Sequence, residues 1–323
     1  MRFKILTPLL LVASLSSCSQ TSVVIEGTVF YFDTVVNYKL YEGTEDDKKE
    51  IDNLLNSYDK ISDNYQKRAE IANICAINET NESVKIDEKL YQLLKTSFST
   101  NEFGASNFNP LCGSLAKAWK DSLAKKELLS EEVVQNELEK INNSSLLFKE
   151  DNTVQRVGEA EIDLGGIAKG YVLDEIFGYL SSKDIKHYLV NGGSSSILLG
   201  EKDSGDGYYN VGIDARIIPN SYLKLKNCFV STSAISVQGV QIEDDGPIYS
   251  HIVNPKNGSV INEQEAVIVV SSKGYVGDAL STSMMMNTVE EIKEIEKAQN
   301  VKCIVFNNKK VSYIHPDLEV LKR

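Results

Sequence analysis

The stretch Glu161-Ile-Asp-Leu-Gly-Gly-Ile-Ala-Lys-Gly170 decides the fold, because a strand-like pattern ends in it and a helical pattern follows it. The apolar residues that come next repeat at the spacing of one helix face: Val172, Leu173, Ile176, Phe177 and Leu180. A turn of two glycines between a strand and a helix points backbone N–H groups, and the positive end of the helix dipole, at whatever lies there. The stretch therefore predicts a site for an anion.

Three groups in this stretch suit a nucleotide and its cation. Asp163 is expected to bind a polar group of a ribose or ring, the Gly166 carbonyl to approach a cation, and Lys169 to neutralise a phosphate. A second interpretation is that the glycines only permit tight helix–strand packing and that Lys169 is solvated. The stretch is neither a Walker loop nor a G-x-G-x-x-G motif. These residues alone leave both interpretations open.

A second segment, Gly277-Asp-Ala-Leu-Ser-Thr282, carries oxygen ligands at helical spacing. Asp278, Ser281 and Thr282 stand at i, i+3 and i+4, so a helix places their side chains on one face. Carboxylate and hydroxyl oxygens are hard ligands of the kind that Mg²⁺ binds. The competing interpretation is that Asp278 only caps the helix. Taken with the first stretch, the segment predicts an Mg²⁺–diphosphate site.

One histidine has a context that suits proton transfer. His251 lies in Ser250-His-Ile-Val-Asn-Pro-Lys-Asn-Gly258, at the end of a predicted strand and before a proline and an Asn-Gly turn. A histidine on such a rigid corner can accept a proton from a hydroxyl near neutral pH. His187, within a strand pattern, and His315, in a turn near the C-terminus, are interpreted as structural.

The remaining patterns predict one α+β unit, with two lobes around a central cleft. Alternating patterns predict strands at 23–32, 34–41, 187–191, 196–199, 209–213, 222–225, 248–253, 266–271, 302–306 and 310–314. Helical patterns run from residue 45 to about 141, from near 277, and over 289–298. Trp119 falls in a helical pattern, where core packing is expected rather than ligand stacking. No low-complexity linker or internal repeat divides the chain.

The N-terminus indicates export. Arg2 and Lys4 precede an apolar run that ends in Leu15-Ser-Ser-Cys18. The run has roughly half of the ~20 residues that a spanning helix needs, so it is typical of a cleaved signal. We interpret residues 1–17 as a bacterial lipoprotein signal, 18–22 as the lipidated cysteine and a tether, and 23–323 as an extracytoplasmic domain anchored to a membrane. An ordinary secretory signal with an incidental Cys18 is the alternative.

Composition excludes one class of partner and leaves the cysteines open. The chain of 323 residues has a formal net charge of −12 and no basic stripe, which argues against nucleic-acid binding. Four widely spaced cysteines remain in the mature chain without a Cys-x-x-Cys pair: Cys75, Cys112, Cys228 and Cys303. They are expected to be small buried apolar residues, and disulfide pairing is not predicted from the sequence.

The motifs occur in an order that resembles the ApbE flavin transferases, also called FAD:protein FMN transferases. The matching blocks are Phe32-Asp-Thr-Val-Val36, Asn107-Phe-Asn-Pro110 with Gly113-Ser-Leu115, Asp163-Leu-Gly-Gly-Ile-Ala-Lys-Gly170, Asn191-Gly-Gly193, Ser231-Thr-Ser233, His251-Ile-Val-Asn-Pro255 with Gly258, and Asp278-Ala-Leu-Ser-Thr282. The resemblance covers essentially the whole mature chain. It implies a single ApbE-like unit related to the T-fold.

The resemblance also implies a substrate and roles for the residues. FAD would have its diphosphate bridged by Mg²⁺, which the Gly166 carbonyl, Asp278, Ser281 and Thr282 would hold. The residues implied to contact FAD are Phe32, Asn107, Phe108, Asn109, Asp163, Lys169 and Ile252. His251 would deprotonate a serine or threonine hydroxyl of an exported redox protein. That oxygen would attack the FMN-side phosphorus, and AMP would leave.

The chain departs from the family pattern at several positions. Asn109 and Asn254 stand where many members carry Asp, and Asp33 and Ala234 stand where many carry Gly. The two missing negative charges bear on metal affinity and on nucleotide placement. Two other functions share the same site residues: an FAD pyrophosphatase that uses water in place of the hydroxyl, and a non-enzymatic flavin-binding lipoprotein that scavenges FAD.

Overall fold

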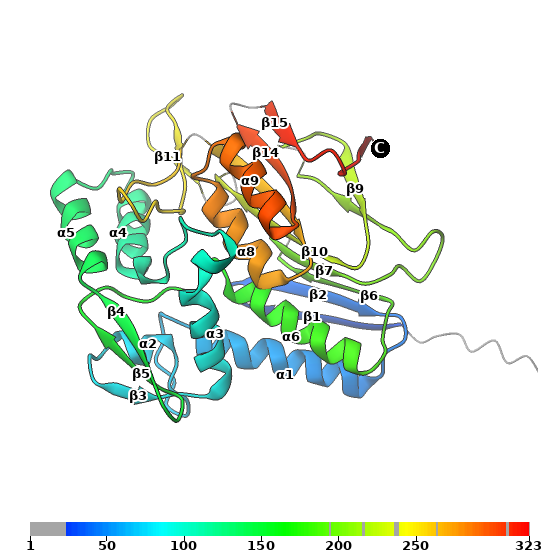
Figure 1. Cartoon of the computed structure of the whole chain (residues 1–323), viewed down its shortest axis with the longest axis horizontal. Helices are drawn as coiled ribbons and strands as arrows, with labels where there is room; N and C mark the ends of the chain where they lie inside the picture. Colours follow the sequence, from blue (N-terminus) through cyan, green and yellow to red (C-terminus); the bar gives the residue numbers. More distant parts are fainter. Residues whose placement is uncertain are drawn as a thin grey trace, which may run out of the picture.

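An antiparallel sheet of eight strands lies at the centre of the molecule in the computed structural model (Figure 1). The structure describes residues 24–193, 195–214, 217–235, 239–262, 264–307 and 310–322. In spatial order the strands are β1 (Ile25–Tyr31), β2 (Thr34–Leu40), β6 (Tyr188–Gly192), β7 (Ser196–Leu199), β10 (Cys228–Ala234), β13 (Gln264–Ser271), β14 (Lys302–Asn307) and β15 (Lys310–Ile314). Segments that are distant in sequence therefore meet in the middle of the sheet.

Four helices cover one face of this sheet (Figure 1). They are α1 (Glu45–Ser62), α6 (Ala168–Ser182), α8 (Gly274–Met284) and α9 (Val289–Gln299). α8 packs on β10 and β13, and α6 lies alongside α8. In α1 the predicted apolar face of Ile51, Leu54, Leu55 and Tyr58 is buried, as its helical spacing requires.

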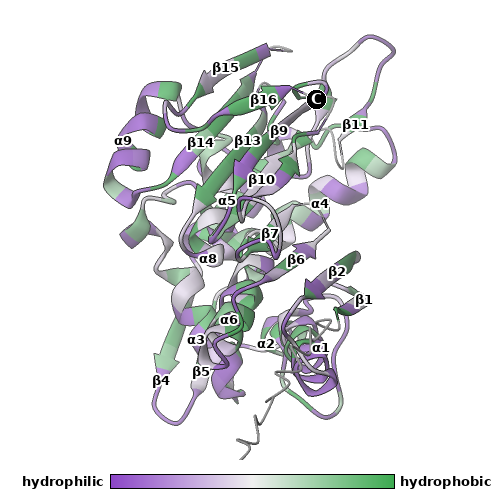
Figure 2. Cartoon of the chain, turned by 90° about the vertical axis from the view of Figure 1, so that its right-hand side faces the viewer, coloured by the Kyte–Doolittle hydropathy of each residue, from purple (hydrophilic) through white to green (hydrophobic). Residues whose placement is uncertain are grey.

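A second apolar cluster lies against alternate residues of the same strands. Val267 and Val269 of β13 belong to the large core with the helices, whereas Ile268 and Val270 belong to the cluster with a small sheet. That sheet has the order β16 (Val320–Lys322), β9 (Ser221–Leu225) and β8 (Tyr209–Gly212). Because β13 is buried on both faces, it has an unbroken apolar run, which Figure 2 shows in green.

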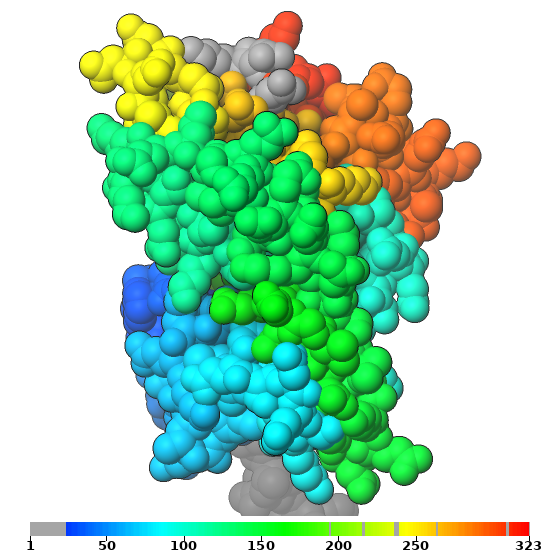
Figure 3. Space-filling model, turned by 90° about the vertical axis from the view of Figure 1, so that its left-hand side faces the viewer, coloured from blue at the N-terminus to red at the C-terminus, as the bar shows by residue number. Residues whose placement is uncertain are grey.

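The section between α1 and α6 forms much of the face that Figure 3 presents, in cyan and green. It contains α2 (Ile74–Asn78), α3 (Glu88–Phe98), η1 (Thr100–Phe103), η2 (Pro110–Cys112), α4 (Gly113–Ala124), α5 (Glu131–Asn142), β3 (Ser83–Lys85), β4 (Ser145–Lys149) and β5 (Thr153–Val157). The last three strands form a sheet in the order β3-β5-β4. A separate pair, β11 (Val240–Gln241) and β12 (Ile248–Tyr249), precedes His251.

The predicted α+β class is confirmed, and most predicted elements are present within a few residues of their expected bounds. Prediction missed the strands β3, β4, β5, β10, β11 and β16. The strand expected to end at the Gly-Gly turn is also absent, because β5 ends at Val157 and residues 158–164 are irregular. The predicted strand at 248–253 was too long, because β12 ends at Tyr249. The Ser250 hydroxyl accepts the Ile252 N–H at 2.7 Å and so competes with strand pairing. The two lobes and the cleft stay a prediction.

The described residues also bear on the cysteines and on membrane insertion. Cys75, Cys112, Cys228 and Cys303 are free. Cys303 is fully buried, as expected of all four, whereas the other three are only partly buried. Within the described ranges, no helix has both the length and the apolar character needed to cross a bilayer. The predicted signal at 1–17 and the tether at 18–22 lie outside the described residues.

Candidate active site

Asp278 is the centre of a buried polar cluster near the start of α8, where it is only 6% exposed. Its Oδ1 accepts hydrogen bonds from the hydroxyls of Ser196 (2.8 Å) and Ser231 (2.6 Å), and its Oδ2 accepts the Gly170 N–H at 2.6 Å. Burial raises the pKa of Asp278, while the positive charge of Lys169 and these hydrogen bonds act in the opposite direction. A carboxylate has about four lone-pair positions, so these three bonds do not saturate it.

Further oxygens lie one turn along α8. The Ser233 hydroxyl is 3.0 Å from the Ser281 hydroxyl and 3.3 Å from that of Thr282. A Cβ placed on Gly166 would stand 3.1 Å from Thr282 Oγ1, so the Gly-Gly turn and α8 are in contact. The structure therefore brings together the four predicted metal ligands, Gly166, Asp278, Ser281 and Thr282, although the two motifs are separate in sequence.

The turn that leads into α6 is held by its own side chain and by α8. Asp163 Oδ1 accepts the Gly165 N–H at 2.6 Å, and Lys169 Nζ lies 3.5 Å from the Gly165 carbonyl oxygen. The Gly170 N–H donates to Asp278, not to the Gly166 carbonyl four residues earlier. The carbonyl expected to bind the cation is thus not taken up by the first turn of the helix.

The segment 107–109 packs directly against this turn. The Phe108 ring would lie 2.8 Å from a Cβ on Gly166, so an alanine there would clash with it. Asn107 is buried and binds the end of α8, its N–H donating to Ser283 Oγ at 3.0 Å. Asn109 Oδ1 accepts the Leu111 N–H at 3.0 Å and caps η2. Asn and Asp are about equally good at such a cap, so an acid at this position would make the same bond.

His251 lies close enough to Lys169 for the positive charge of that lysine to act on its imidazole. Its side chain is exposed, yet the protein that surrounds the rest of the ring lowers its pKa from the ordinary 6.5. The positive charges of Lys169 and Lys120 lower this pKa further, and Asp163 opposes them. At neutral pH the imidazole is therefore uncharged and able to accept a proton.

Two buried contacts fix the loop of His251. Trp119 Nε1 donates to the Gly258 carbonyl at 2.7 Å, and Trp119 is buried as predicted. Gly258 has φ +72, and a Cβ there would lie 2.5 Å from Val134, so only glycine fits this corner. Ile252 is buried in the main core beside His251. The histidine thus stands on a rigid turn.

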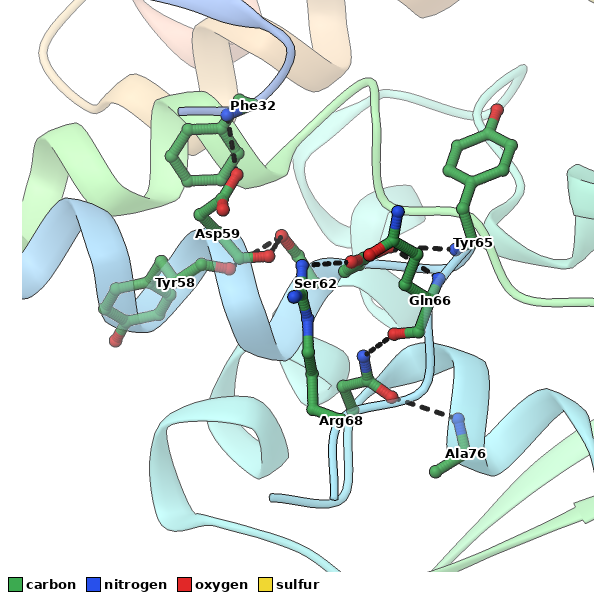
Figure 4. A network of polar contacts seen from close by, with 10 residues as sticks. Phe32, Tyr58, Asp59, Ser62, Tyr65, Gln66, Arg68 and Ala76 are labelled. Atoms are coloured by element: carbon green, nitrogen blue, oxygen red, sulfur yellow. Dashed lines mark hydrogen bonds and ion pairs between the residues drawn. The ribbon is translucent and has the colours of Figure 1, made fainter. Parts of the chain in front are cut away.

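The β1–β2 turn carries Phe32 in a conformation that is rare for an aromatic residue. Phe32 and Asp33 have φ +53 and +55, the left-handed region. The Phe32 N–H donates to Asp59 of α1 at 2.6 Å, as Figure 4 shows. Burial raises the pKa of Asp59, and the Phe32 N–H acts against that rise. The turn is therefore anchored to α1, and such local strain is frequent at functional sites.

Sequence reasoning missed the partners of Asp278. Ser196 and Ser231 are buried hydroxyls from β7 and β10, and Ser233 stands two residues further along the same face of β10. A period of two in Ser231-Thr-Ser233 was the signal that could have found them, because alternate strand residues share a face. Asp174 of α6, which binds the start of α8, was also missed.

The donor set fits a magnesium ion. Among the described residues there is no group of three or more His, Cys, Asp and Glu side chains that could hold a metal. The cluster instead offers one carboxylate with hydroxyl and carbonyl oxygens. Mg²⁺ characteristically binds through one or two carboxylates and completes its shell with substrate phosphates and water. A single Asp278 is therefore sufficient only when phosphate is also present.

Known proteins match the chain in sequence. A FAD:protein FMN transferase of Klebsiella pneumoniae is 26% identical over 217 residues, or 64% of this chain and 65% of that protein. One of Vibrio cholerae is 24% identical over 284 residues, or 82% of this chain and 81% of the other. The chain thus aligns with just under two thirds of the first relative and about four fifths of the second.

Solved structures match the fold, and a family model matches the sequence. The ApbE protein of Thermotoga maritima superposes with a TM-score of 0.74 at 22% identity, covering 88% of this chain and 94% of that one. The flavin transferase ApbE of Vibrio cholerae gives 0.69 at 20% identity, covering 93% and 97%. The model of the ApbE family matches residues 32–305, which is most of the sequence. This chain therefore belongs to the ApbE family.

Proposed function

We propose that this protein transfers FMN from FAD to a serine or threonine hydroxyl of an acceptor protein and releases AMP. One observation carries the proposal: the turn that bears Lys169 packs against the oxygen cluster of α8, where Asp278 accepts the Gly170 N–H. The positive charge of Lys169 also lowers the pKa of His251, so an anion held by Lys169 would lie near both the cluster and the histidine. Membership of the ApbE family, and relatives named FAD:protein FMN transferase, support the same reaction.

The proposed step is a displacement at the FMN-side phosphorus of FAD. His251 accepts the proton of the acceptor hydroxyl, and the oxygen forms a bond to that phosphorus. The bond from the phosphorus to the bridging oxygen breaks, and AMP leaves with the bonding electrons on that oxygen. FMN remains on the acceptor as a phosphodiester. Lys169 neutralises charge on the phosphoryl oxygens during the step.

The cation and the flavin contacts are part of the proposal. The Gly166 carbonyl, Asp278, Ser281 and Thr282 would hold Mg²⁺, which supplies positive charge where the diphosphate oxygens become more negative. The FAD contacts that we propose are Phe32, Asn107, Phe108, Asn109, Asp163, Lys169 and Ile252. Phe32, on its anchored turn, and Phe108, packed on Gly166, offer aromatic surface to the flavin.

The exposure of His251 favours a second candidate, an FAD pyrophosphatase. The solvent that reaches the imidazole can lose a proton to it as a hydroxyl does. Water would then attack the same phosphorus and yield FMN and AMP. The two activities use the same residues and differ only in the attacking oxygen.

The proposed location follows from the N-terminal sequence. Small residues before Cys18 and the positive residues before the apolar run support a lipoprotein signal. We propose that Cys18 carries lipid and anchors residues 23–323 outside the cytoplasm. Exported redox proteins would then be the acceptors.

Product analysis tests the function. The mature chain is incubated with FAD and Mg²⁺, with and without a protein that carries a threonine flavinylation motif, and all products are analysed by mass spectrometry. We expect the acceptor to gain the mass of FMN less water, together with stoichiometric AMP, and to gain nothing in EDTA. FMN and AMP beside an unmodified acceptor would establish the pyrophosphatase instead. FAD that is bound and never cleaved would leave only a binding protein.

A further inference from the structure

Two helices that meet at the site carry the same five-residue pattern. α6 contains Gly170-Tyr-Val-Leu-Asp174, and α8 contains Gly274-Tyr-Val-Gly-Asp278. Each pattern lies at the N-terminal end of its helix. The spacing from glycine to aspartate is one helical turn in both, so each aspartate stands one turn above its glycine.

The helices touch at the two glycines. A Cβ on Gly170 would lie 2.2 Å from the Gly274 carbonyl oxygen, and a Cβ on Gly274 would lie 2.3 Å from the Gly170 carbonyl oxygen. The rings of Tyr171 and Tyr275 lie next to each other, with centroids 6.1 Å apart and planes tilted by 43°. Each helix therefore begins against the backbone of the other, with no side chain between them.

Each of the two aspartates accepts a backbone N–H from the other helix. Asp278 of α8 accepts the Gly170 N–H of α6 at 2.6 Å, and Asp174 of α6 accepts the Tyr275 N–H of α8 at 2.8 Å. Lys273, at the N-cap position of α8, gives its helix no side-chain cap. The unpaired N–H groups of a helix start need such a partner, and a carboxylate also suits the positive end of the dipole. Asp174 supplies it from the neighbouring helix.

We propose that Asp174 is a positioning residue, which fixes the first turn of α8 and thereby aims Asp278, Ser281 and Thr282 at the cation. This inference rests on the proposed function, in which these three residues bind Mg²⁺. All three stand on α8 within two turns of the Tyr275 N–H, so a shift of that first turn moves the whole ligand face.

The environment of Asp174 agrees with this role. The side chain is partly buried, and burial raises its pKa to about 6. The Tyr275 and Gly274 N–H groups and Lys273 lower this pKa, and the charge of Asp278 raises it.

The test is the Mg²⁺ dependence of FAD binding, measured by flavin fluorescence in a Mg²⁺ titration with the full chain. We expect Asp174→Ala to weaken the apparent Mg²⁺ affinity by about ten- to hundred-fold, as partners of metal ligands do. FAD binding in EDTA should not change. Asp174→Asn keeps an oxygen that can accept the Tyr275 N–H, so it should stay within about threefold of the wild type.

Asp87→Ala is the matched control. Asp87 caps α3, a helix of 11 residues like α8, by accepting the Lys89 N–H at 2.8 Å. The substitution should lower the melting temperature and leave the Mg²⁺ dependence unchanged. The inference is wrong if Asp174→Ala keeps the wild-type Mg²⁺ dependence, if Asp87→Ala weakens it as much, or if Asp174→Asn loses as much as Asp174→Ala.

A measurement on the wild type guards against a variant that does not fold. Hydrogen exchange should show the first turns of α6 and α8 gaining protection together when Mg²⁺ and FAD are added. Protection of only one of them would overturn the inference. If wild-type FAD binding shows no Mg²⁺ dependence, the proposed cation site is wrong and the inference falls with it. If FAD binding depends on Mg²⁺ to the same extent in the wild type and in the Asp174→Ala variant, the inference about Asp174 is wrong but the proposed cation site stands.

Discussion

His251 and Asp278 have pKa values displaced in opposite directions, although the charge of Lys169 acts on both. Desolvation by the surrounding protein and the charge of Lys169 both favour the neutral imidazole of His251. At Asp278 burial favours the protonated acid, while Lys169 and three hydrogen bonds favour the anion. Such a pair, one neutral and the other dependent on neighbouring positive charge, suits separate roles in proton transfer and cation binding.

The two roles predict different losses on substitution. His251→Ala should lower kcat for FMN transfer by about 100- to 10,000-fold, because a general base contributes that much, and should leave Mg²⁺-dependent FAD binding intact. Asp278→Ala should abolish that binding and also lower the melting temperature, because Ser196, Ser231 and the Gly170 N–H lose their acceptor. Calorimetric FAD titrations beside single-turnover kinetics separate the cases. The reverse pattern would overturn the roles.

The pH dependence of transfer follows from the lowered pKa of His251. The base is active when it is uncharged. We therefore expect kcat/KM not to change with pH near neutrality, and to fall only as the pH drops through a value below 6.5. Lys169→Gln removes a positive charge that lowers this pKa. The acid limb should then move to higher pH, in addition to any rise in KM for FAD. A pH–rate profile that is unchanged by the substitution would contradict the placement of Lys169 beside His251.

At the level of elements, the glycine contact between α6 and α8 sets the site. Because the helices approach to backbone contact, Asp278 can reach the Gly170 N–H and Asp174 can reach that of Tyr275. The contact is specific to one turn of each helix. Elsewhere on α6, Gly178 has no atom within 4 Å of the place where a Cβ would stand.

This difference gives a matched pair of substitutions on one helix. Gly170→Ala places a methyl group 2.2 Å from the Gly274 carbonyl oxygen, so it should lower the free energy of unfolding by about 1–3 kcal/mol and weaken FAD binding. Gly178→Ala should raise that free energy by up to about 1 kcal/mol, because alanine favours the helix and meets no neighbour. Urea unfolding of both variants checks the prediction. Equal effects would show that the helices separate more easily than the structure indicates.

The elements differ in how far the sequence predicted them. The helical spacing of Asp278, Ser281 and Thr282 is a local property, and α8 has the face that this spacing predicts. Strand β10 was missed because Ser231-Thr-Ser233 lacks apolar alternation and has little strand signal of its own. Pairing with β7 on one side and β13 on the other makes this segment a central strand. On the face toward α8, the Ser231 hydroxyl donates to Asp278, and the Ser233 hydroxyl lies 3.0 Å from that of Ser281.

At the scale of the whole molecule, the chain from Val24 onward enters the sheet at once through β1, which is an edge strand. A lipid on Cys18 would therefore be joined to the folded domain by only a short tether. Such a tether would restrict the domain to acceptors at the same membrane surface.

Substitution of the anchor tests this arrangement. Cys18→Ala should move the protein from the membrane fraction to the soluble fraction of cells, because no lipid can be attached there. Transfer to a soluble acceptor in the purified state should keep the wild-type kcat. Fractionation with immunoblotting and an acceptor mass assay provide the two readouts. A Cys18→Ala protein that stays in the membrane fraction would exclude lipidation at this residue as the anchor.

The sequence by itself determined the chemistry available. It placed the proposed cation ligands at helical spacing, the Gly-Gly turn before a helix, and His251 shortly before a proline and an Asn-Gly corner. All of these are relations between near neighbours in the chain, which backbone geometry alone decides. The order of the motifs added the family resemblance that the comparisons bear out.

Only the tertiary structure decided which of these groups meet. The hydrogen bonds to Asp278 join residues separated by 47, 82 and 108 positions, from Ser231, Ser196 and Gly170. These contacts depend on the strand order of the sheet and on the approach of α6 to α8. Neither propensity nor periodicity specifies such long-range packing, because it results from the burial of all the elements at once. The reciprocal hydrogen bonds that Asp174 and Asp278 make to each other's helices are therefore seen only in the folded structure.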